Sequence, residues 1–137
     1  LKGIDDENAG IYRSIQVSIT GEETLPPAAN DVPVLMEGLV TWYAEQKDGL
    51  HPVELAARFH YQFVKIHPFI DGNGRAIRIL VNLILMQYGY PMVIIPVVRR
   101  AEYMQSLHST ATEEDFLTFF TSVVYENLKD YLRMITP

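Results

Sequence analysis

The sequence predicts a mainly α-helical protein with one short β-hairpin, folded as a single domain over residues 1–137. Apolar residues recur at helical spacing in several segments between residues 31 and 134. They alternate in only one segment, residues 14–27, which is typical of a hairpin. With 48% hydrophobic and 20% charged residues, a chain of 137 residues can bury roughly two-thirds of its unfolded surface.

Composition excludes several classes of protein. The net charge of -6 argues against a nucleic-acid-binding body, because phosphate backbones demand a basic face. The sequence has no cysteine, so it forms neither disulfides nor thiolate metal sites. The longest apolar stretch, residues 77–86, is interrupted by Asn82 and is far shorter than the roughly 20 residues of a membrane span. We expect a soluble protein, cytoplasmic by default, with neither a membrane nor a nucleic acid as partner.

The first segments set the hairpin and the first helix. Residues 1–13 are polar and acidic and predict a loop. In residues 14–27 the alternating apolar residues precede a Gly21-Glu22 turn, and Pro26-Pro27 ends the run, so we predict a hairpin there. Asp31 is the predicted cap of a helix that has Pro33 in its first turn and ends near residues 48–49.

Four more helices follow from their boundary signals. His51-Pro52 opens the second helix, which ends at residue 66 because Pro68 disfavours the helical region for His67. The third, residues 73–88, is apolar on nearly every face and is predicted to be the central helix of a bundle. A short helix spans about residues 100–109. Thr112 and Asp115 resemble a capping box that opens a last helix to about residue 134.

The most informative segment is the run His-Pro-Phe-Ile-Asp-Gly-Asn-Gly-Arg-Ala-Ile-Arg at residues 67–78. It lies between two predicted helices and combines a proton acceptor, a carboxylate, a glycine-rich stretch and two guanidinium groups. The backbone amides of residues 72–74 would crown a helix N-terminus, and such an end attracts phosphate. This set of groups suits chemistry on a nucleotide.

The run matches, position for position, the signature of the Fic family, His-Pro-Phe-x-(Asp or Glu)-Gly-Asn-Gly-Arg-x-x-Arg. The resemblance also includes residues 50–61, residues 82–87 and the hairpin, and so covers essentially the whole chain. It is to the subclass whose inhibitory helix precedes the core. The resemblance implies a Fic-type helical bundle with a hairpin flap over the active site. It also implies AMPylation, in which AMP from Mg-ATP is transferred to a Ser, Thr or Tyr hydroxyl of a target protein. Homodimers are common in the family.

The motif residues then have expected roles. His67 would be the general base, because an imidazole with a pKa near 6.5 is often neutral at pH 7. Asp71 would hold Mg²⁺. A cradle for the α-phosphate would come from Gly72, Asn73 and Gly74. Two arginines, Arg75 and Arg78, would clamp the β- and γ-phosphates, with Arg75 and Asn73 joining His67 in catalysis. Simpler readings are a helix-capping histidine, a loop-capping aspartate and surface salt bridges.

Outside the motif, the resemblance points to two further elements. One is the flap edge, which in Fic enzymes pairs with an extended segment of the target and is formed here by Gln16, Val17, Ser18, Ile19 and Thr20. An ordinary hairpin that covers the core would look the same in sequence. The other is Tyr103, which lies where family members pack the adenine, although a tyrosine at helical spacing also suits the core. The histidines at positions 51, 60 and 108 form no ligand spacing and are expected to be structural.

Regulation in the family depends on an inhibitory helix with the pattern (Ser or Thr)-x-x-x-Glu-(Gly or Asn), whose glutamate pairs with the second motif arginine. Sixty-six residues precede His67, too few for that helix as well, so we expect it to be absent from this chain. A literal match occurs at Ser122, Glu126 and Asn127, and we interpret it as chance in an ordinary closing helix. The substitution Glu126→Gly is therefore predicted to leave activity unchanged, and a large gain would contradict this.

Two alternatives to AMP transfer stay open at the level of sequence. Some Fic enzymes remove AMP from a modified protein, with the inhibitory glutamate positioning the water. The expected absence of the inhibitory helix from this chain argues against that reaction. A catalytically silent nucleotide-binding module is the other alternative, and the intact His67 argues against it.

Overall fold

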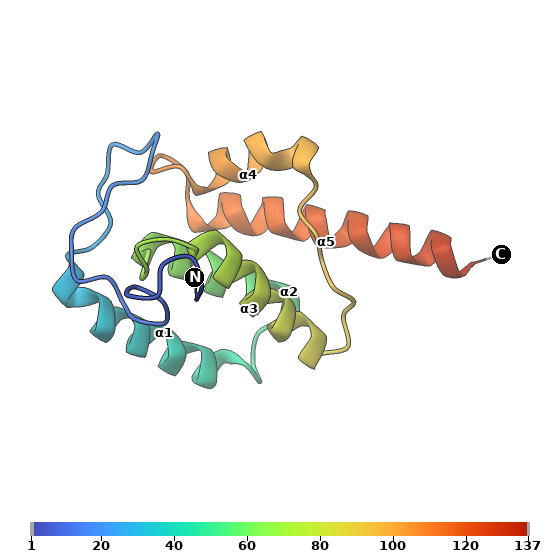
Figure 1. Cartoon of the computed structure of the whole chain (residues 1–137). Helices are drawn as coiled ribbons and strands as arrows, with labels where there is room; N and C mark the ends of the chain where they lie inside the picture. Colours follow the sequence, from blue (N-terminus) through green and yellow to red (C-terminus); the bar gives the residue numbers. More distant parts are fainter. Residues whose placement is uncertain (1, 137) are drawn as a thin grey trace.

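The computed structural model describes residues 2–136, and they form a mainly helical fold (Figure 1). The α-helices are α1 (Val32–Gln46), α2 (Pro52–Ile66), α3 (Asn73–Gln87), α4 (Arg100–Leu107) and α5 (Glu113–Ile135). Short 3-10 turns, Ala29–Asp31 and Val97–Arg99, lead into α1 and α4. All the helices predicted from the sequence are present, with ends that differ by a few residues. Within residues 2–136, every helix is too short or too polar to cross a membrane.

The centre of the bundle is α2, which packs against α1, α3 and α5, while α4 lies along α5 (Figure 1). The prediction that the third helix is central is therefore wrong. α3 buries Ile77 and Val81 on one side but leaves Ile79 and Leu83 more than half exposed on the other. An apolar composition does not tell which faces find a neighbour. In α2, by contrast, the fully buried Ala56 and Ala57 allow neighbouring helices to approach closely.

Capping interactions at the helix N-termini explain where α2 and α5 begin. α5 begins with the predicted capping box: Asp115 N donates to Thr112 Oγ1 at 3.2 Å and Thr112 N donates to Asp115 Oδ2 at 2.7 Å. At α2, the ring of His51 accepts a hydrogen bond from Val53 N at 3.3 Å, and Pro52 fills the first position. Asp31 precedes α1, but its side chain makes no capping bond because the 3-10 turn already leads the backbone into the helix.

An aromatic cluster fills the core between α2 and α5. Phe116 and Phe120 are almost completely buried, with ring centroids 5.9 Å apart. The ring of His60, which is fully buried, stacks on Phe116 with 4.6 Å between centroids. This packing fixes α2 against α5 and so holds the end of α2, where His67 follows, in place.

The predicted β-hairpin is not formed, since residues 2–136 contain no β-strand. Residues 14–27 are instead an irregular loop, the flap loop, with a tight turn in which Glu22 N donates to Ile19 O at 3.0 Å. A side chain joins its two arms, because Gln16 Nε2 donates to Pro26 O at 2.9 Å. Pro26 and Pro27 have no backbone N–H to give to a ladder, so the alternating apolar pattern alone is not enough to pair the arms.

Candidate active site

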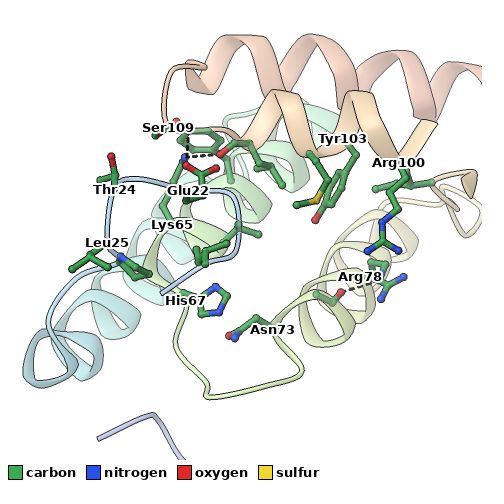
Figure 2. Close-up of a pocket in the computed structure, with 18 of the residues that line it drawn as sticks. Glu22, Thr24, Leu25, Lys65, His67, Asn73, Arg78, Arg100, Tyr103 and Ser109 are labelled. Carbon is green, nitrogen blue, oxygen red and sulfur yellow. Dashed lines mark hydrogen bonds between the residues drawn. The ribbon is translucent and has the colours of Figure 1, made fainter. Parts of the chain in front are cut away.

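A cavity of about 610 Å³ opens between the end of α2, the start of α3, α4 and the flap loop (Figure 2). Five residues predicted from the motif and its surroundings line it: His67, Asn73, Gly74, Arg78 and Tyr103. Of the predicted flap-edge residues 16–20, Ile19 joins them. The fold therefore brings the histidine, two residues of the predicted phosphate cradle and one motif arginine around one space.

His67 directly follows α2 and has a backbone conformation that is unusual for a residue with a side chain. Its φ of 51° and ψ of 62° are left-handed, while its N–H still bonds to Phe63 O at 3.0 Å. The sequence predicts that Pro68 excludes the helical region, and the left-handed region is the outcome. Holding a non-glycine residue there costs of order 1–3 kcal/mol, which the surrounding structure must supply. The chain turns sharply at this residue and leaves the imidazole on the cavity wall.

The imidazole of His67 is about half-buried, and its Nδ1 is buried with no hydrogen-bond partner among the described residues. Burial lowers the pKa of His67 below its ordinary value of 6.5, and the nearby charge of Arg13 lowers it further. The neutral ring is therefore favoured at pH 7. A neutral imidazole that faces a cavity can accept a proton.

Arg13 is the residue that ties the flap loop to His67, and the sequence analysis missed it. Its side chain is 3% exposed and is held by carbonyl groups: Nε donates to His67 O at 2.8 Å and NH2 to Pro27 O at 2.6 Å. Its backbone N–H also donates to Pro68 O at 2.9 Å. A lone arginine in a polar N-terminal stretch gives no sequence signal for this role, because the carbonyl groups of His67 and Pro68 that it binds lie more than 50 positions away.

Asn73, the first residue of α3, braces the loop between α2 and α3. Its side-chain Oδ1 accepts from Phe69 N at 3.0 Å and its Nδ2 donates to Phe69 O at 2.8 Å. The amide is 6% exposed, and one Nδ2 hydrogen remains for another acceptor. In this structure the Asn73 side chain stabilises the conformation of the loop. Its contact with an α-phosphate stays a prediction.

The two glycines of the cradle differ in what they require. Gly72 has a φ of 82°, a left-handed conformation that side chains rarely adopt, and it lets the loop turn into α3. Gly74 is helical, and a Cβ added there would meet no atom within 4 Å. The backbone does not demand glycine at position 74. Its value is the open space it leaves on the cavity wall beside the α3 N-terminus.

The two motif arginines do not lie together, contrary to the expected clamp. Arg78 lines the cavity, and its Nε donates to Gly74 O at 2.9 Å (Figure 2). Arg75 is not among the cavity-lining residues and forms an ion pair with Asp71 at 3.0 Å, with both side chains more than half exposed. Spacing of three residues allowed both to face one way, but the carboxylate of Asp71 lies one turn back and attracts Arg75. An exposed pair of this kind is weak, so it can open at little cost.

Asp71 is the predicted magnesium ligand, and its surroundings fit a metal that arrives with a ligand. No group of three metal-binding side chains occurs in the part of the chain that the structure describes. Magnesium needs only one or two carboxylates when phosphate oxygens and waters complete its shell. A single exposed carboxylate beside a phosphate cradle meets that requirement.

Tyr103 of α4 forms part of the cavity wall and rests on His60 of α2. The two rings meet edge to face, 5.7 Å apart, and the Tyr103 hydroxyl lies 3.4 Å from His60 Nε2. Burial raises the pKa of Tyr103 to about 12, and burial lowers the pKa of His60 to about 3. Tyr103 is thus both a core residue and a cavity residue, so the two readings left open by the sequence are compatible.

Charged residues that the sequence analysis did not single out also line the cavity. Lys65, at the end of α2, donates to Leu107 O at 2.7 Å. Glu22, at the flap turn, accepts from Ser109 N at 2.9 Å and so links the flap loop to the segment after α4. Arg100 is at the first position of α4. None of them belongs to the motif, and only the fold brings them to this cavity.

Ser122 and Glu126, the match to the inhibitory pattern that we interpret as chance, are not among the residues that line the cavity. Arg99 holds both of them, with NH1 to Glu126 Oε2 at 3.1 Å and NH2 to Ser122 Oγ at 2.9 Å. The ion pair of Glu126 is therefore with Arg99 and not with Arg78.

Of the predicted flap residues, Val17 and Ile19 are half-buried, whereas Gln16, Ser18 and Thr20 are exposed. Within the described structure, no backbone N–H of residues 16–20 donates to another backbone group. The backbone N–H groups of this stretch therefore have no backbone partner, although Ile19 O accepts from Glu22 N and Val17 O accepts from Gln16 Nε2.

The fold and the site define a helical domain that places a histidine and a helix N-terminus around one cavity of about 610 Å³. Comparison with known proteins shows the family to which the chain belongs. The model of the Fic/DOC family matches residues 1–85. A curated relative, protein adenylyltransferase Fic of Drosophila grimshawi, is 42% identical over 136 residues, which is 96% of this chain and 28% of the relative. The chain belongs to the Fic/DOC family.

Solved structures agree with this placement. A fragment of Fic-1 from C. elegans is 35% identical and superposes with a TM-score of 0.85, covering 96% of this chain and 39% of that one. A Fic domain containing signaling protein from Bacteroides thetaiotaomicron is 36% identical, with a TM-score of 0.75, covering 88% of this chain and 53% of that one. The chain thus spans little more than a quarter of the curated Drosophila relative's length.

Proposed function

We propose that this chain transfers AMP from Mg-ATP to a hydroxyl group of a target protein. One observation carries the proposal: His67 lies on the wall of the cavity that also holds the N-terminal residues of α3, Asn73 and Gly74. A proton acceptor and a phosphate-binding helix end around one space are what nucleotidyl transfer needs. The name of the Drosophila relatives, protein adenylyltransferase, supports the same reaction.

In the proposed reaction one bond forms, one bond breaks and one proton is transferred. The oxygen of the target hydroxyl attacks the α-phosphorus, and its proton passes to the neutral imidazole of His67. The bond between the α-phosphorus and the bridging oxygen breaks, and pyrophosphate leaves with the electron pair. His67 suits the first task because its lowered pKa keeps it unprotonated at pH 7. General base catalysis of this kind contributes typically 10²–10⁴-fold to the rate.

The phosphates are the second requirement. The backbone amides at the start of α3 favour an anion, and Gly74 leaves room for it. Arg78 is positioned to stabilise charge on the departing pyrophosphate. Arg75 can join it after leaving its weak ion pair with Asp71, which would free that carboxylate to hold Mg²⁺. The metal would supply charge neutralisation at the phosphates.

The flap loop is the proposed docking site of the target. The backbone N–H groups of its residues 16–20 have no backbone partner in the described structure, so an extended target segment can add to them as a strand and find main-chain partners. Such pairing would order the loop in the conformation that the sequence predicts for it. Arg13 fixes the base of this loop to the backbone of His67, so a docked hydroxyl would be aligned with the base. A homodimer stays a prediction.

The test is intact-mass spectrometry of the purified chain and of candidate target proteins after incubation with Mg-ATP. The expected result is a gain equal to the mass of one adenylyl group, which disappears in His67→Ala. ATP binding without any adduct, across many targets, would contradict the proposal and favour a silent nucleotide-binding module. Loss of an adenylyl group from a pre-modified target would indicate the reverse reaction.

A further inference from the structure

We propose that Arg100, at the start of α4, binds the terminal phosphates of the nucleotide together with Arg78, and so makes the cavity select a triphosphate over a monophosphate. This inference rests on the proposed function and extends it to a residue outside the motif. Both arginines line the 610 Å³ cavity. Figure 2 shows their guanidinium groups directed into the same part of it, one from α4 and one from α3.

Neither guanidinium has an anionic partner. Within residues 2–136, no carboxylate lies within ion-pair distance of Arg78 or Arg100. Arg78 donates only to the carbonyl of Gly74 at 2.9 Å. In a chain with a net charge of -6, acidic groups are abundant, so two unpaired cations at one cavity are not explained by a lack of partners.

The neighbouring Arg99 shows what an arginine with a structural role looks like in this protein. Its guanidinium binds Glu102 at 2.8 Å and Glu126 at 3.1 Å, and lies 5.0 Å from the ring centroid of Phe119. Its side chain is 16% exposed, whereas Arg100 is exposed at the cavity. Two arginines adjacent in sequence therefore have opposite surroundings. One is neutralised by the fold, and the other is left for a ligand.

The remaining charged groups of the cavity do not neutralise Arg100. Glu22, the acidic residue among those that line it, accepts from Ser109 N, and Lys65 is itself a cation. Arg100 also occupies the N-terminal position of α4, where the helix dipole disfavours a positive charge. An anion in the cavity would offset this cost and would neutralise the positive charge of both arginines.

The geometry indicates an anion longer than one phosphate. Arg78 Nε donates to Gly74 O at 2.9 Å, so its guanidinium lies near the first turn of α3, where the helix N-terminus would hold the first phosphate. Arg100 belongs to a different helix and reaches the cavity from α4. A chain of phosphates that begins at the α3 N-terminus can contact both arginines, whereas the one phosphate of AMP, held at that helix end, does not need Arg100.

Isothermal titration calorimetry of the His67→Ala chain, which avoids turnover, tests the inference with Mg-ATP and with AMP. In that background, Arg100→Gln should raise the Kd for ATP on the order of ten- to a hundredfold, as expected for a lost charge-assisted hydrogen bond. The Kd for AMP should not change. Arg99→Gln is the matched control, since it removes the adjacent charge but should keep the ratio of the two affinities. Arg100→Lys should recover part of the ATP affinity.

Two results would overturn the role of Arg100: an unchanged Kd for ATP in Arg100→Gln, or an equal rise for ATP and AMP. The second result would mean that the substitution damaged the cavity as a whole. If the His67→Ala parent binds neither nucleotide, the proposed function itself fails. That outcome is distinct, because it appears before any arginine is changed.

Discussion

Two irregular segments flank α3, and each is held by an asparagine whose side-chain amide bonds to both the N–H and the C=O of one residue in the segment. Before the helix, Asn73 binds Phe69 N and O in the motif loop, residues 67–72. After the helix, Asn82 binds Val93 in the link, residues 88–96, accepting from its N at 2.7 Å and donating to its O at 3.0 Å. The pair of hydrogen bonds is the same in both segments, but the number of positions between the asparagine and its partner differs.

This difference in sequence separation also distinguishes the two sides of the cavity. In the motif loop the brace joins residues only four apart, so it is a property of the motif itself. In the link the brace from Asn82 spans eleven residues, and Asn127 of α5 adds a second, with Ile94 N to its Oδ1 at 3.1 Å. The link carries the chain to α4, where Tyr103 and Arg100 lie. The histidine side of the cavity is thus set locally and the α4 side by tertiary contacts.

The largest effect is expected from removing the two asparagine braces one at a time. Asn73→Ala and Asn82→Ala should each cost about 1–3 kcal/mol of unfolding free energy, because each leaves backbone groups unpaired. Asn73→Ala should also lower AMP transfer about 100-fold, since it displaces the loop that carries the reacting groups. Asn82→Ala should keep most of its activity once folded. Urea unfolding and a transfer assay measure the two effects. Equal activity losses would show that the two sides are not set independently.

The second-largest effect is a loss of stability at acidic pH, caused by protonation of the buried His60, which contacts Tyr103 of α4. Its pKa is about 3 in the fold and near 6.5 when unfolded, so the fold favours the neutral ring. The contribution is therefore complete above pH 6.5 and is lost progressively as the pH falls toward 3. Between pH 7 and pH 5 the loss should be about 2 kcal/mol. His60→Phe should remove it, because a phenyl ring can stack on Phe116 without charging.

Unfolding free energies of the parent and of His60→Phe, measured by urea at pH 7 and pH 5, give the comparison. His108→Phe is a suitable control, since His108 lies near the surface and bonds to Thr110. An identical pH dependence in the parent and His60→Phe would contradict the assignment.

A smaller effect is expected on the histidine side from Arg13. Arg13 lowers the pKa of His67, so Arg13→Met should raise that pKa toward its ordinary value. The transfer rate at pH 6 should then fall relative to the rate at pH 8, because more of the base is protonated at the lower pH. NMR titration of the His67 ring measures the pKa directly. The carboxylate-paired Arg58 is the control, and Arg58→Met should leave the titration unchanged.

The smallest effect on stability is expected from adding one methyl group to either of two helical glycines. Gly74→Ala and Gly38→Ala both place a Cβ in open space, so neither should lower the melting temperature, and each should raise the free energy of unfolding by up to about 1 kcal/mol. Only Gly74→Ala should weaken ATP binding, because only Gly74 lines the cavity. Calorimetry and thermal unfolding separate these outcomes. Unchanged ATP affinity in Gly74→Ala would show that the nucleotide does not approach this part of α3.

The sequence determined the elements whose causes are local. The capping box of α5, the end of α2 before Pro68 and the motif loop follow from bonds between residues a few positions apart. Local rules also predicted that His67 and Gly74 would lie at one helix junction. The predicted hairpin failed because strand pairing needs partners for every backbone group, and residues 14–27 find side-chain and carbonyl contacts instead.

Only the tertiary structure decided which helix is central, which motif arginine faces the cavity and which residues from elsewhere complete it. Arg13 reaches His67 across 54 positions, and Arg100 reaches the cavity from α4. Contacts of this kind depend on how helices pack, and helix packing depends on the shape of whole faces. Periodicity and motifs describe one segment at a time. They therefore predicted the histidine side of the site and left its α4 side to the fold.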